Sequence, residues 1–532
     1  MVVKIGVSVT RFAVTHTTSH LYSLELHRTF DISRYFSGSV EGVLSLQELS
    51  LLSRIVTMTI LGKIREIVWG APAATKAERR LIVKVDFFIL SYVCLMYWCN
   101  YLDRANLNNA YVSGMREDLK FHGTQLNQIN TIFYGGYMLG QIPNNIIMQR
   151  VSPRIWLPVT CVIWGFFTLG TAFTTHPYQI MVIRFFQAFF EASCFVGVQW
   201  ILGSWYKPSE IGKRTAIFTS AGLAGTMFSG LIQGGIISSL KNRHGLAGWR
   251  WLFIIDFLIT FPIAIYGFFF FPDTPMSTTA RYLSPHERTL AVERLPEVIK
   301  PRGVLGWSLI RRVIASWHFW AFVLLWIANS NTEMYSSNGI FQLYLKSLKN
   351  PAYTTPQVNY IPTSVSAMGI VATLLLGWYS DYNPARNRWH VGIFLSLTAI
   401  TSGALMLHPH TRGGRFAALV LNGCQYAGQT TMFAWANDMT RGDDAKRAVI
   451  ISCMNMFSVA VYLFWSLLFY NATQGPVWFK GDWAMIAMGL FLLCVTVCTY
   501  LLQRRQERRQ AVGGGFNGEE EDGQVHKFDL QK

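Results

Sequence analysis

Residues 249–271 read WRWLFIIDFLITFPIAIYGFFFF, an almost unbroken apolar run. A helix of this length rises about 1.5 Å per residue and can cross a hydrocarbon layer about 30 Å thick. The rest of the chain has the same character, since 51% of its 532 residues are hydrophobic and only 14% are charged. These features predict a membrane protein rather than a set of soluble domains.

Eleven further apolar runs lie on either side of this one. We expect them at residues 85–105, 126–149, 155–174, 178–204, 213–238, 316–338, 359–380, 389–408, 414–437, 446–470 and 483–502. A polar stretch at 272–312 separates the first six runs from the last six. The predicted fold is therefore an all-α membrane protein with twelve transmembrane helices in two six-helix bundles, the layout of transporters whose halves rock about a central site.

The sequence divides into five predicted parts. They are a partly disordered cytoplasmic region at 1–80, an N-terminal bundle at 81–271, a cytoplasmic loop at 272–312, a C-terminal bundle at 313–502, and a disordered cytoplasmic tail at 503–532. In the loop, Ser284 and Glu287 form a capping box that predicts a short surface helix. Residues 1–57 leave an alternative open, in which the native protein begins at Met58.

The basic residues predict how the chain lies in the bilayer. The formal net charge of +17 comes from short clusters between apolar runs, which argues against nucleic acid as a partner. Clusters follow the second, fourth and twelfth runs and comprise Arg150, Arg154, Lys207, Lys213, Arg214, Arg504, Arg505, Arg508 and Arg509. The positive-inside rule then places both termini and the central loop in the cytoplasm, although Lys241, Arg243 and Arg250 run against the pattern.

Other classes of function find little support in the sequence. We find no cluster of His and Cys with metal-ligand spacing and no nucleophile cluster, so we expect neither an enzyme nor a metal or organic cofactor. The eight cysteines lie within apolar runs, where they behave as small hydrophobic residues.

Four charged residues stand out among those inside predicted spans, where an ionisable group is costly unless it faces a cavity or a partner. Asp103 and Arg104 come late in the first run, and Arg184 and Glu191 lie in the fourth. Because these two runs are antiparallel, both arginines fall in the outer third, and Glu191 lies two helical turns below Arg184 on the same face. Arginine suits a carboxylate and a buried acid suits a proton. The alternative is that these residues form buried structural ion pairs or lie at the level of the lipid headgroups.

Two further groups are candidates for a role in transport. The seventh run is too polar to face lipid, and we predict that Asn329 and Glu333 hydrogen-bond a substrate. A gating kink or an exposed helix end is the alternative. After the eighth run, Asp381 with Arg386 and Arg388 predicts a cluster that holds helix ends and acts in gating. Asp256 has fewer polar companions, and we assign it a structural role.

Several motifs resemble one family. Residues 377–381 (GWYSD) with Arg386 and Arg388 are similar to the loop motif of the major facilitator superfamily in its second half, whereas GQIPNN at 140–145 lacks the acidic residue of the first-half copy. More specific patterns are NYLDRANLNNAYVSGM at 100–115, RFFQAFFE at 184–191, PDTP at 272–275 and WAN at 435–437. With them, residues 63–502 resemble the fungal anion:cation symporter family of that superfamily.

The resemblance implies a proton-coupled importer of a small organic monocarboxylate in the fungal plasma membrane. It implies that Arg104 and Arg184, with Asn100 beside them, hold the carboxylate, and that Asp103 and Glu191 handle protons. The proton is then the coupling ion, and the protein works as a monomer in the lipid bilayer.

The substrate branch rests on two further stretches. FFILSYVCLMYW at 87–98 and PQVNYIPT at 356–363 look most like the pantothenate permease branch. The alternatives are permeases for allantoate, nicotinate, biotin or sulfur compounds, and an exporter of a secondary metabolite. A nutrient receptor that binds without transporting is the alternative from another class.

Overall fold

The computed structural model describes residues 75–240, 243–295, 307–337, 339–349, 352–382, 384–407, 412–440 and 444–528. The region at 1–74, with the alternative start at Met58, lies outside the described residues. Within the described ranges the regular structure is helical, apart from an isolated bridge between Lys349 and Ala352. The prediction of an all-α chain is confirmed.

Each of the first six expected runs is helical. The first combines α-helix with π-helical turns and is kinked at Ser113 and Gly114. Its elements are α3 (Lys76–Val85), η2 (Asp86–Leu90), α4 (Ser91–Ala110), η3 (Tyr111–Met115) and α5 (Arg116–Asp118). The next five are α6 (Gln125–Arg150), α7 (Pro153–Thr171), α8 (Pro177–Trp205), α9 (Pro208–Ser239) and α10 (Gly248–Phe270), with the short turn η4 (Arg243–Gly245) between the last two. These segments form the first half of the described fold.

The last six runs are also helical. A short helix, α11 (Pro285–Glu293), lies between the halves, and α12 (Trp307–Ile314) leads into the second. The remaining elements are α13 (Trp317–Ser337), α14 (Ile340–Ser347), α15 (Thr355–Tyr360), α16 (Thr363–Tyr382), α17 (Pro384–Leu407), α18 (Arg412–Asn422), η5 (Gly423–Tyr426), α19 (Ala427–Met439), α20 (Asp444–Phe469), η6 (Ala472–Gln474) and α21 (Phe479–Phe528).

Not all of these helices are equally apolar. Among the described residues, nine are long and apolar enough to cross a membrane, or ten if α12 and α13, which meet at 69°, form one span. The runs expected at 126–149 and 414–437 are helical, but they are not long and apolar enough to meet this requirement. In α6, polar residues such as Asn127 and Asn144 are buried against other helices instead of facing lipid, and the second run is divided among α18, η5 and α19.

The C-terminal segment differs from the expectation. We expected a disordered tail from residue 503, but α21 continues as a helix to Phe528. Residues 503–511 (QRRQERRQA) are strong helix formers, and Gln503 donates a hydrogen bond to Glu507 one turn later at 2.8 Å. The helical pattern therefore does not stop where the apolar pattern does.

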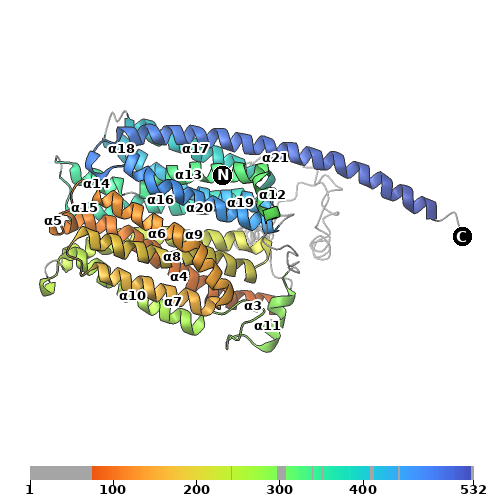
Figure 1. The fold of residues 1–532 in the computed structure, drawn as a ribbon, viewed down its shortest axis with the longest axis horizontal. Helices are drawn as coiled ribbons and strands as arrows, with labels where there is room; N and C mark the ends of the chain where they lie inside the picture. The colour runs from red at the N-terminus through yellow and green to blue at the C-terminus, as the bar shows by residue number, and fades with distance from the viewer. Residues whose placement is uncertain are drawn as a thin grey trace, which may run out of the picture. The chain divides into compact units, whose positions relative to one another are not determined.

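The two halves meet along four long helices. In the first half α4 packs against α9 and α10, and α8 packs against α6 and α7. Between the halves α9 packs against α15 and α16, and α6 against α20. Figure 1 shows α3 and α11 at one end of the helices, and α5, α14 and α15 at the other. We call these the α11 end and the α5 end.

Glycine on α9 permits close contact between helices. A Cβ atom at Gly225 would lie 2.1 Å from the main-chain oxygen of Trp98 on α4. At Gly234 it would lie 2.2 Å from the ring of Tyr360 on α15. Helix α9 therefore touches both halves at positions where no larger side chain fits.

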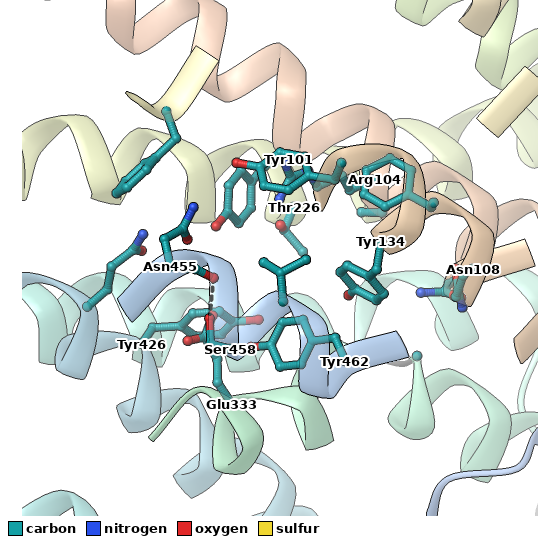
Figure 2. A pocket seen from close by; sticks show the side chains of 18 of the residues that line it. Tyr101, Arg104, Asn108, Tyr134, Thr226, Glu333, Tyr426, Asn455, Ser458 and Tyr462 are labelled. Carbon is teal, nitrogen blue, oxygen red and sulfur yellow. Dashed lines mark hydrogen bonds between the residues drawn. The ribbon is translucent and has the colours of Figure 1, made fainter. Parts of the chain in front are cut away.

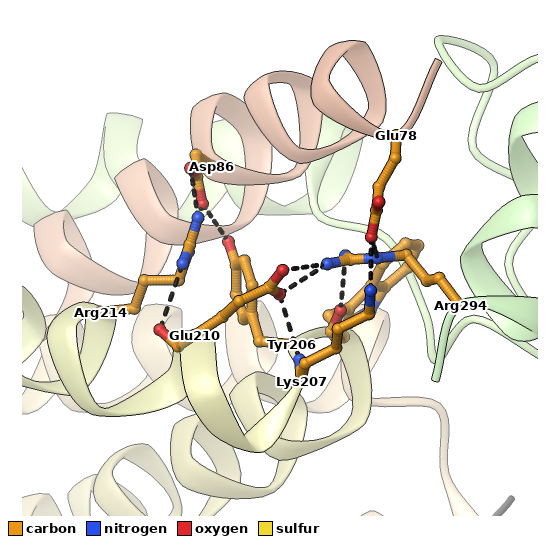
Figure 3. A network of polar contacts seen from close by, with 8 residues as sticks. Glu78, Asp86, Tyr206, Lys207, Glu210, Arg214 and Arg294 are labelled. Atoms are coloured by element: carbon orange, nitrogen blue, oxygen red, sulfur yellow. Dashed lines mark hydrogen bonds and ion pairs between the residues drawn. The ribbon is translucent and has the colours of Figure 1, made fainter. Parts of the chain in front are cut away.

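An ionic network fixes α11 to the first half (Figure 3). The predicted capping box is present, since Glu287 N donates to Ser284 Oγ at 3.2 Å and Ser284 N donates to Glu287 Oε2 at 2.9 Å. Just after α11, Arg294 pairs with Glu78 at 3.2 Å and with Glu210 at 2.5 Å, and its side chain is only 3% exposed. One arginine therefore links the segment after α11 to α3 and α9.

Removal of Arg294 tests this link. Arg294→Ala leaves two largely buried carboxylates without that partner, and we expect it to destabilise the fold by about 3 kcal/mol. The melting temperature of the purified protein in detergent should fall by several degrees. Arg281→Ala is the control, because Arg281 is exposed in the same loop. Equal melting temperatures for the two variants would contradict the assignment.

Candidate functional site

A cavity of about 150 Å³ lies between the halves. Figure 2 shows its walls, with Arg104 and Tyr134 from the first half facing Glu333 and Tyr462 from the second. Helices α4, α6, α8 and α9 supply one wall, and α13, α14, η5, α19 and α20 supply most of the other. Relative motion of the two halves would therefore open or close the route from solvent to this cavity.

Arg104 lies in the wall of this cavity. Its guanidinium carbon is 4.8 Å from the centre of the Tyr137 ring, 5.2 Å from that of Tyr101 and 5.4 Å from that of Phe133. Its Nε donates to Glu191 Oε2 at 3.3 Å. The aromatic faces stabilise the cation, and the side chain remains 26% exposed. Arg104 therefore faces the cavity while its Nε is paired with Glu191.

Arg184 also lines the cavity, but it has no acidic partner. Its Nη1 donates to the main-chain oxygen of Asp103 and to Gln187 Oε1, both at 3.3 Å, and its Nη2 donates to the main-chain oxygen of Arg104 at 3.2 Å. Its buried Nε has no acceptor. Within the described residues no carboxylate oxygen lies within 4.0 Å of this guanidinium. Such a buried cation calls for an anion.

Glu191 lies behind Arg104 and is completely buried. Three groups hold its carboxylate: Asn100 Nδ2 at 3.1 Å, Gln187 Nε2 at 2.9 Å, and Arg104 Nε at 3.3 Å. Asn100, which the resemblance places beside the substrate carboxylate, lies outside the cavity lining and donates to Glu191. The ion pair between Arg104 and Glu191 is a contact of the kind that the alternative reading, structural ion pairs, describes.

Asp103 is also buried, one layer behind the cavity. Its Oδ1 accepts a hydrogen bond from Thr168 on α7 at 2.6 Å. Gln187 Nε2 donates to the same Thr168 hydroxyl at 3.2 Å and also to Glu191. A chain of hydrogen bonds therefore joins Asp103 to Glu191, although the two acids lie on different helices.

The second-half wall contains one of the two residues predicted from the seventh run. Glu333 lines the cavity, whereas Asn329 is buried outside it and donates to the main-chain oxygen of Gln425 at 3.3 Å. Tyr462 donates to the main-chain oxygen of Ser330 at 2.8 Å, and its ring lies 5.0 Å from that of Tyr134 across the interface. Sequence reasoning missed most of the polar lining, which comprises Asn108, Asn130, Gln342, Gln429, Asn455 and Ser458.

The predicted gating cluster is partly assembled. Arg388 lies 3.6 Å from Asp381 and 2.6 Å from Asp438, and its Nη1 donates to Ser380 Oγ at 3.0 Å. These contacts join α16, α17 and α19 within the second half. Sequence reasoning missed Asp438, and the side chain of Arg386 lies outside the described residues.

Comparison with known proteins identifies the family. The pattern of the Major Facilitator Superfamily matches residues 93–466, which contain the cavity arginines and most of both halves. The chain belongs to the major facilitator superfamily. This major facilitator protein is a multi-pass membrane transporter and not an enzyme, in agreement with the prediction.

Its relatives include fungal vitamin transporters. The chain is 44% identical to a pantothenate transporter of Saccharomyces cerevisiae, over 81% of this chain and 85% of that protein. It is 38% identical to a pantothenate transporter of Schizosaccharomyces pombe, over 85% and 87% respectively. A vitamin H transporter of Saccharomyces cerevisiae is 30% identical over 83% of this chain and 75% of that protein.

A solved structure of the same fold supports the assignment. The crystal structure of a bacterial homologue of the human lysosomal transporter Spinster aligns with a TM-score of 0.55 and 17% identity. The alignment covers 79% of this chain and 97% of that one. At this identity the likeness concerns the fold alone.

At the α5 end of this major facilitator transporter, hydrogen bonds and an ion pair connect the two halves directly. Asn127 on α6 donates to the main-chain oxygens of Ser466 at 3.2 Å and Tyr470 at 2.9 Å, and its Oδ1 accepts from Ala472 N at 2.9 Å. Lys346 pairs with Glu117 across the same end at 2.9 Å. These contacts hold the halves together on that side of the cavity.

Asn127→Ala should therefore favour opening at the α5 end. The lost hydrogen bonds stabilise the form that is closed at the α5 end by roughly 1–3 kcal/mol. The ratio of this closed form to the open form should therefore fall about tenfold or more. Spin labels at the exposed positions of His122 and Thr473 would report longer distances. Gln128→Ala is the control, because Gln128 bonds only within its own helix. Unchanged distances between the two spin labels in Asn127→Ala would show that the hydrogen bonds of Asn127 do not hold the α5 end closed.

Proposed function

We propose that this transporter imports a small monocarboxylate together with a proton, and that pantothenate is its substrate. The observation that carries the proposal is Arg184, a buried guanidinium that lines the cavity without a carboxylate partner among the described residues. A substrate carboxylate would supply the missing charge. The names of two relatives, which are 44% and 38% identical to this chain, support pantothenate.

The cavity chemistry fits the rest of such a molecule. Pantothenate carries an amide and hydroxyl groups besides its carboxylate. The lining offers amide side chains at Asn130, Gln429 and Asn455, with a hydroxyl at Ser458 and aromatic rings around them. Polar groups that converge in an apolar pocket are the usual basis of orientation and specificity. The arginines of this lining are Arg104 and Arg184. A substrate with a second carboxylate group would have no additional arginine there to pair with.

The proton acts through Glu191. While Glu191 is ionised it holds Arg104 at 3.3 Å, so only Arg184 is ready for the anion. Protonation of Glu191 removes that attraction and frees the Arg104 fork for the substrate carboxylate. Each ligand therefore favours binding of the other, which is the thermodynamic requirement for symport.

The proposal includes an orientation and a membrane. The basic loops support an orientation with both termini cytoplasmic, and we assign the protein to the fungal plasma membrane. A monomer suffices, because the described halves form the cavity within one chain. Asp103 also belongs to the proton-handling part of the site, through its link to Glu191.

Uptake in cells tests this proposal. Cells that lack their own pantothenate permease would express the chain and receive labelled pantothenate at acidic external pH, with and without a protonophore. Accumulation that the protonophore abolishes is the expected result. A correctly located protein that transports nicotinate, biotin or allantoate but not pantothenate would overturn the substrate. Binding without flux would indicate a receptor, and net export would reverse the direction.

A further inference from the structure

Helix α12 carries an exposed apolar stripe. Its sequence is WSLIRRVI, and Leu309 and Val313 are buried in the same apolar cluster as residues of α13 and α20. On another side of the helix, Trp307, Ile310 and Ile314 are 78%, 44% and 47% exposed. Positions that are three, four and seven residues apart lie on one face of a helix, so these three side chains form a continuous stripe. Helix α12 is therefore apolar on two sides, and only one of them packs against α13 and α20.

The direction of α12 differs from that of the membrane spans. Its axis makes an angle of 69° with the span that begins at Trp317. Membrane spans have an average tilt of about 20° from the bilayer normal, so a helix at 69° to a span runs close to the membrane plane. Figure 1 shows α12 at the same end of the helices as α3 and α11. Helix α12 therefore has the position and the direction of a helix that lies on a membrane surface.

The exposed stripe continues into the lipid-facing surface of α13. Trp320, in the first turn of α13, is 53% exposed, and its indole Nε1 donates to the main-chain oxygen of Ile314 at 2.9 Å. Leu324, one turn further along α13, is also exposed. Because the chain is a multi-pass membrane protein, exposed apolar side chains on its spans face lipid, and tryptophan is enriched where lipid meets water. The stripe on α12 therefore lies at the edge of the lipid-facing surface.

A basic residue borders the stripe. Arg311 follows Trp307 by four residues and Ile310 by one, which places it beside the stripe. Its side chain is exposed and has no acidic partner among the described residues. The helix contains no acid, and Arg312 adds a second positive charge. A long arginine side chain can lay its stem along an apolar layer while its guanidinium binds the oxygens of a phosphate. The surface that fits this combination is that of an anionic phospholipid layer.

We propose that α12 is an interfacial helix that binds the surface of an anionic phospholipid leaflet, with its apolar stripe in the lipid and Arg311 on a lipid phosphate. In the proposed orientation this is the cytoplasmic leaflet, where anionic phospholipids are concentrated. The helix thereby holds the start of α13, whose residue Glu333 lines the cavity. The inference goes beyond the proposed substrate and does not depend on it.

Hydrogen–deuterium exchange of the full chain in lipid nanodiscs tests this contact. Discs of phosphatidylcholine alone are compared with discs that also contain phosphatidylserine, and mass spectrometry follows peptides that cover residues 307–314. Exchange of these amides should be slower by about fivefold or more when phosphatidylserine is present, because a lipid surface that binds the helix suppresses its opening. Equal exchange in both kinds of disc would overturn the proposal.

Two variants with the same loss of charge separate a local contact from general attraction to the surface. Arg311→Ala should lose about fivefold of the protection by phosphatidylserine, the effect of one basic residue at an anionic surface. Arg312→Ala is the matched control. Arg312 is two residues from Ile310 and from Ile314, so it lies on the opposite side of the helix from the stripe, and its variant should keep most of the protection. Equal loss in the two variants would contradict the contact assigned to Arg311.

Other occupants of the stripe predict different results. If a second copy of the chain covered the stripe, the same amides would be protected equally in both kinds of disc and in detergent, which would overturn the proposal. Protection by inorganic phosphate in discs of phosphatidylcholine alone would also overturn it, because the site would then bind a soluble anion. Ile310→Asp should remove the protection by phosphatidylserine, since it places a negative charge in the stripe. Ile310 and Arg311 are exposed, so the melting temperatures of their variants in detergent should match that of the wild type.

Discussion

Arg184→Ala is expected to abolish saturable uptake. The guanidinium lines the cavity with its Nε unpartnered, and it is the cation that has no acid to neutralise it among the described residues. Loss of a buried charge partner for the substrate carboxylate is worth about 3 kcal/mol or more, which corresponds to an affinity lower by about 100-fold or more. Binding of labelled pantothenate to purified protein measures this directly.

Two further variants sharpen the result. Arg184→Lys keeps the charge but loses the planar fork, so it should restore only a small part of the affinity. Arg154→Ala is the matched control, because Arg154 is an arginine of the first half that reaches only the Thr279 hydroxyl at 3.5 Å. Wild-type affinity in Arg184→Ala would show that the carboxylate binds elsewhere.

Glu191→Gln is expected to separate binding from proton coupling. The amide mimics the protonated acid, so Arg104 is free for the anion whatever the pH. The variant should exchange labelled for unlabelled pantothenate across a membrane at close to the wild-type rate. It should fail to accumulate pantothenate above equilibrium when a pH gradient is imposed, and its affinity should not change with pH.

The matched control for this variant lies one turn away. Gln187 donates to the same carboxylate at 2.9 Å but carries no proton to exchange. Gln187→Ala should weaken uptake moderately and leave its dependence on the pH gradient intact. Gradient-driven accumulation by Glu191→Gln would show that another group carries the coupling proton.

Most of the helical fold could be predicted from the sequence, because the apolar runs are long and each half contains a similar series. The deviations have physical causes. In helix α6, Asn127 and Asn144 are buried against other helices. The helix is therefore less apolar than the composition test for a membrane span requires, although we expect it to cross the membrane. The run expected at 414–437 contains the tight turn η5, where a Cβ at Gly423 would lie 2.3 Å from the main-chain oxygen of Val365.

Part of the site could also be predicted. Arg184 and Glu191 are separated by two helical turns, and this spacing indicates a shared face before any contact is known. The opposite directions of the two helices predict that Arg104 and Arg184 lie at a similar depth. The sequence left open whether these charges pair with one another, and the ion pair between Arg104 and Glu191 is known from the structure alone.

The remaining residues had no local signal. Asp256 is a lone acid in an apolar run, and its hydrogen bond with Asn106 depends on how α10 packs against α4. Tyr134 and Tyr462 meet only because the halves join. Asn100 donates to the Glu191 side chain and Asn329 to the main-chain oxygen of Gln425, and neither lines the cavity. Such contacts arise from the tertiary arrangement, and a pattern within one helix does not contain them.

The central claim is that one proton on Glu191 accompanies each anion that the arginines bind. Purified protein in a weakly buffered solution, titrated with pantothenate at neutral pH, would report proton uptake per ligand bound. The account predicts close to one proton for the wild type and none for Glu191→Gln at comparable occupancy. Saturable binding without proton uptake by the wild type, or the same uptake in both proteins, would contradict it.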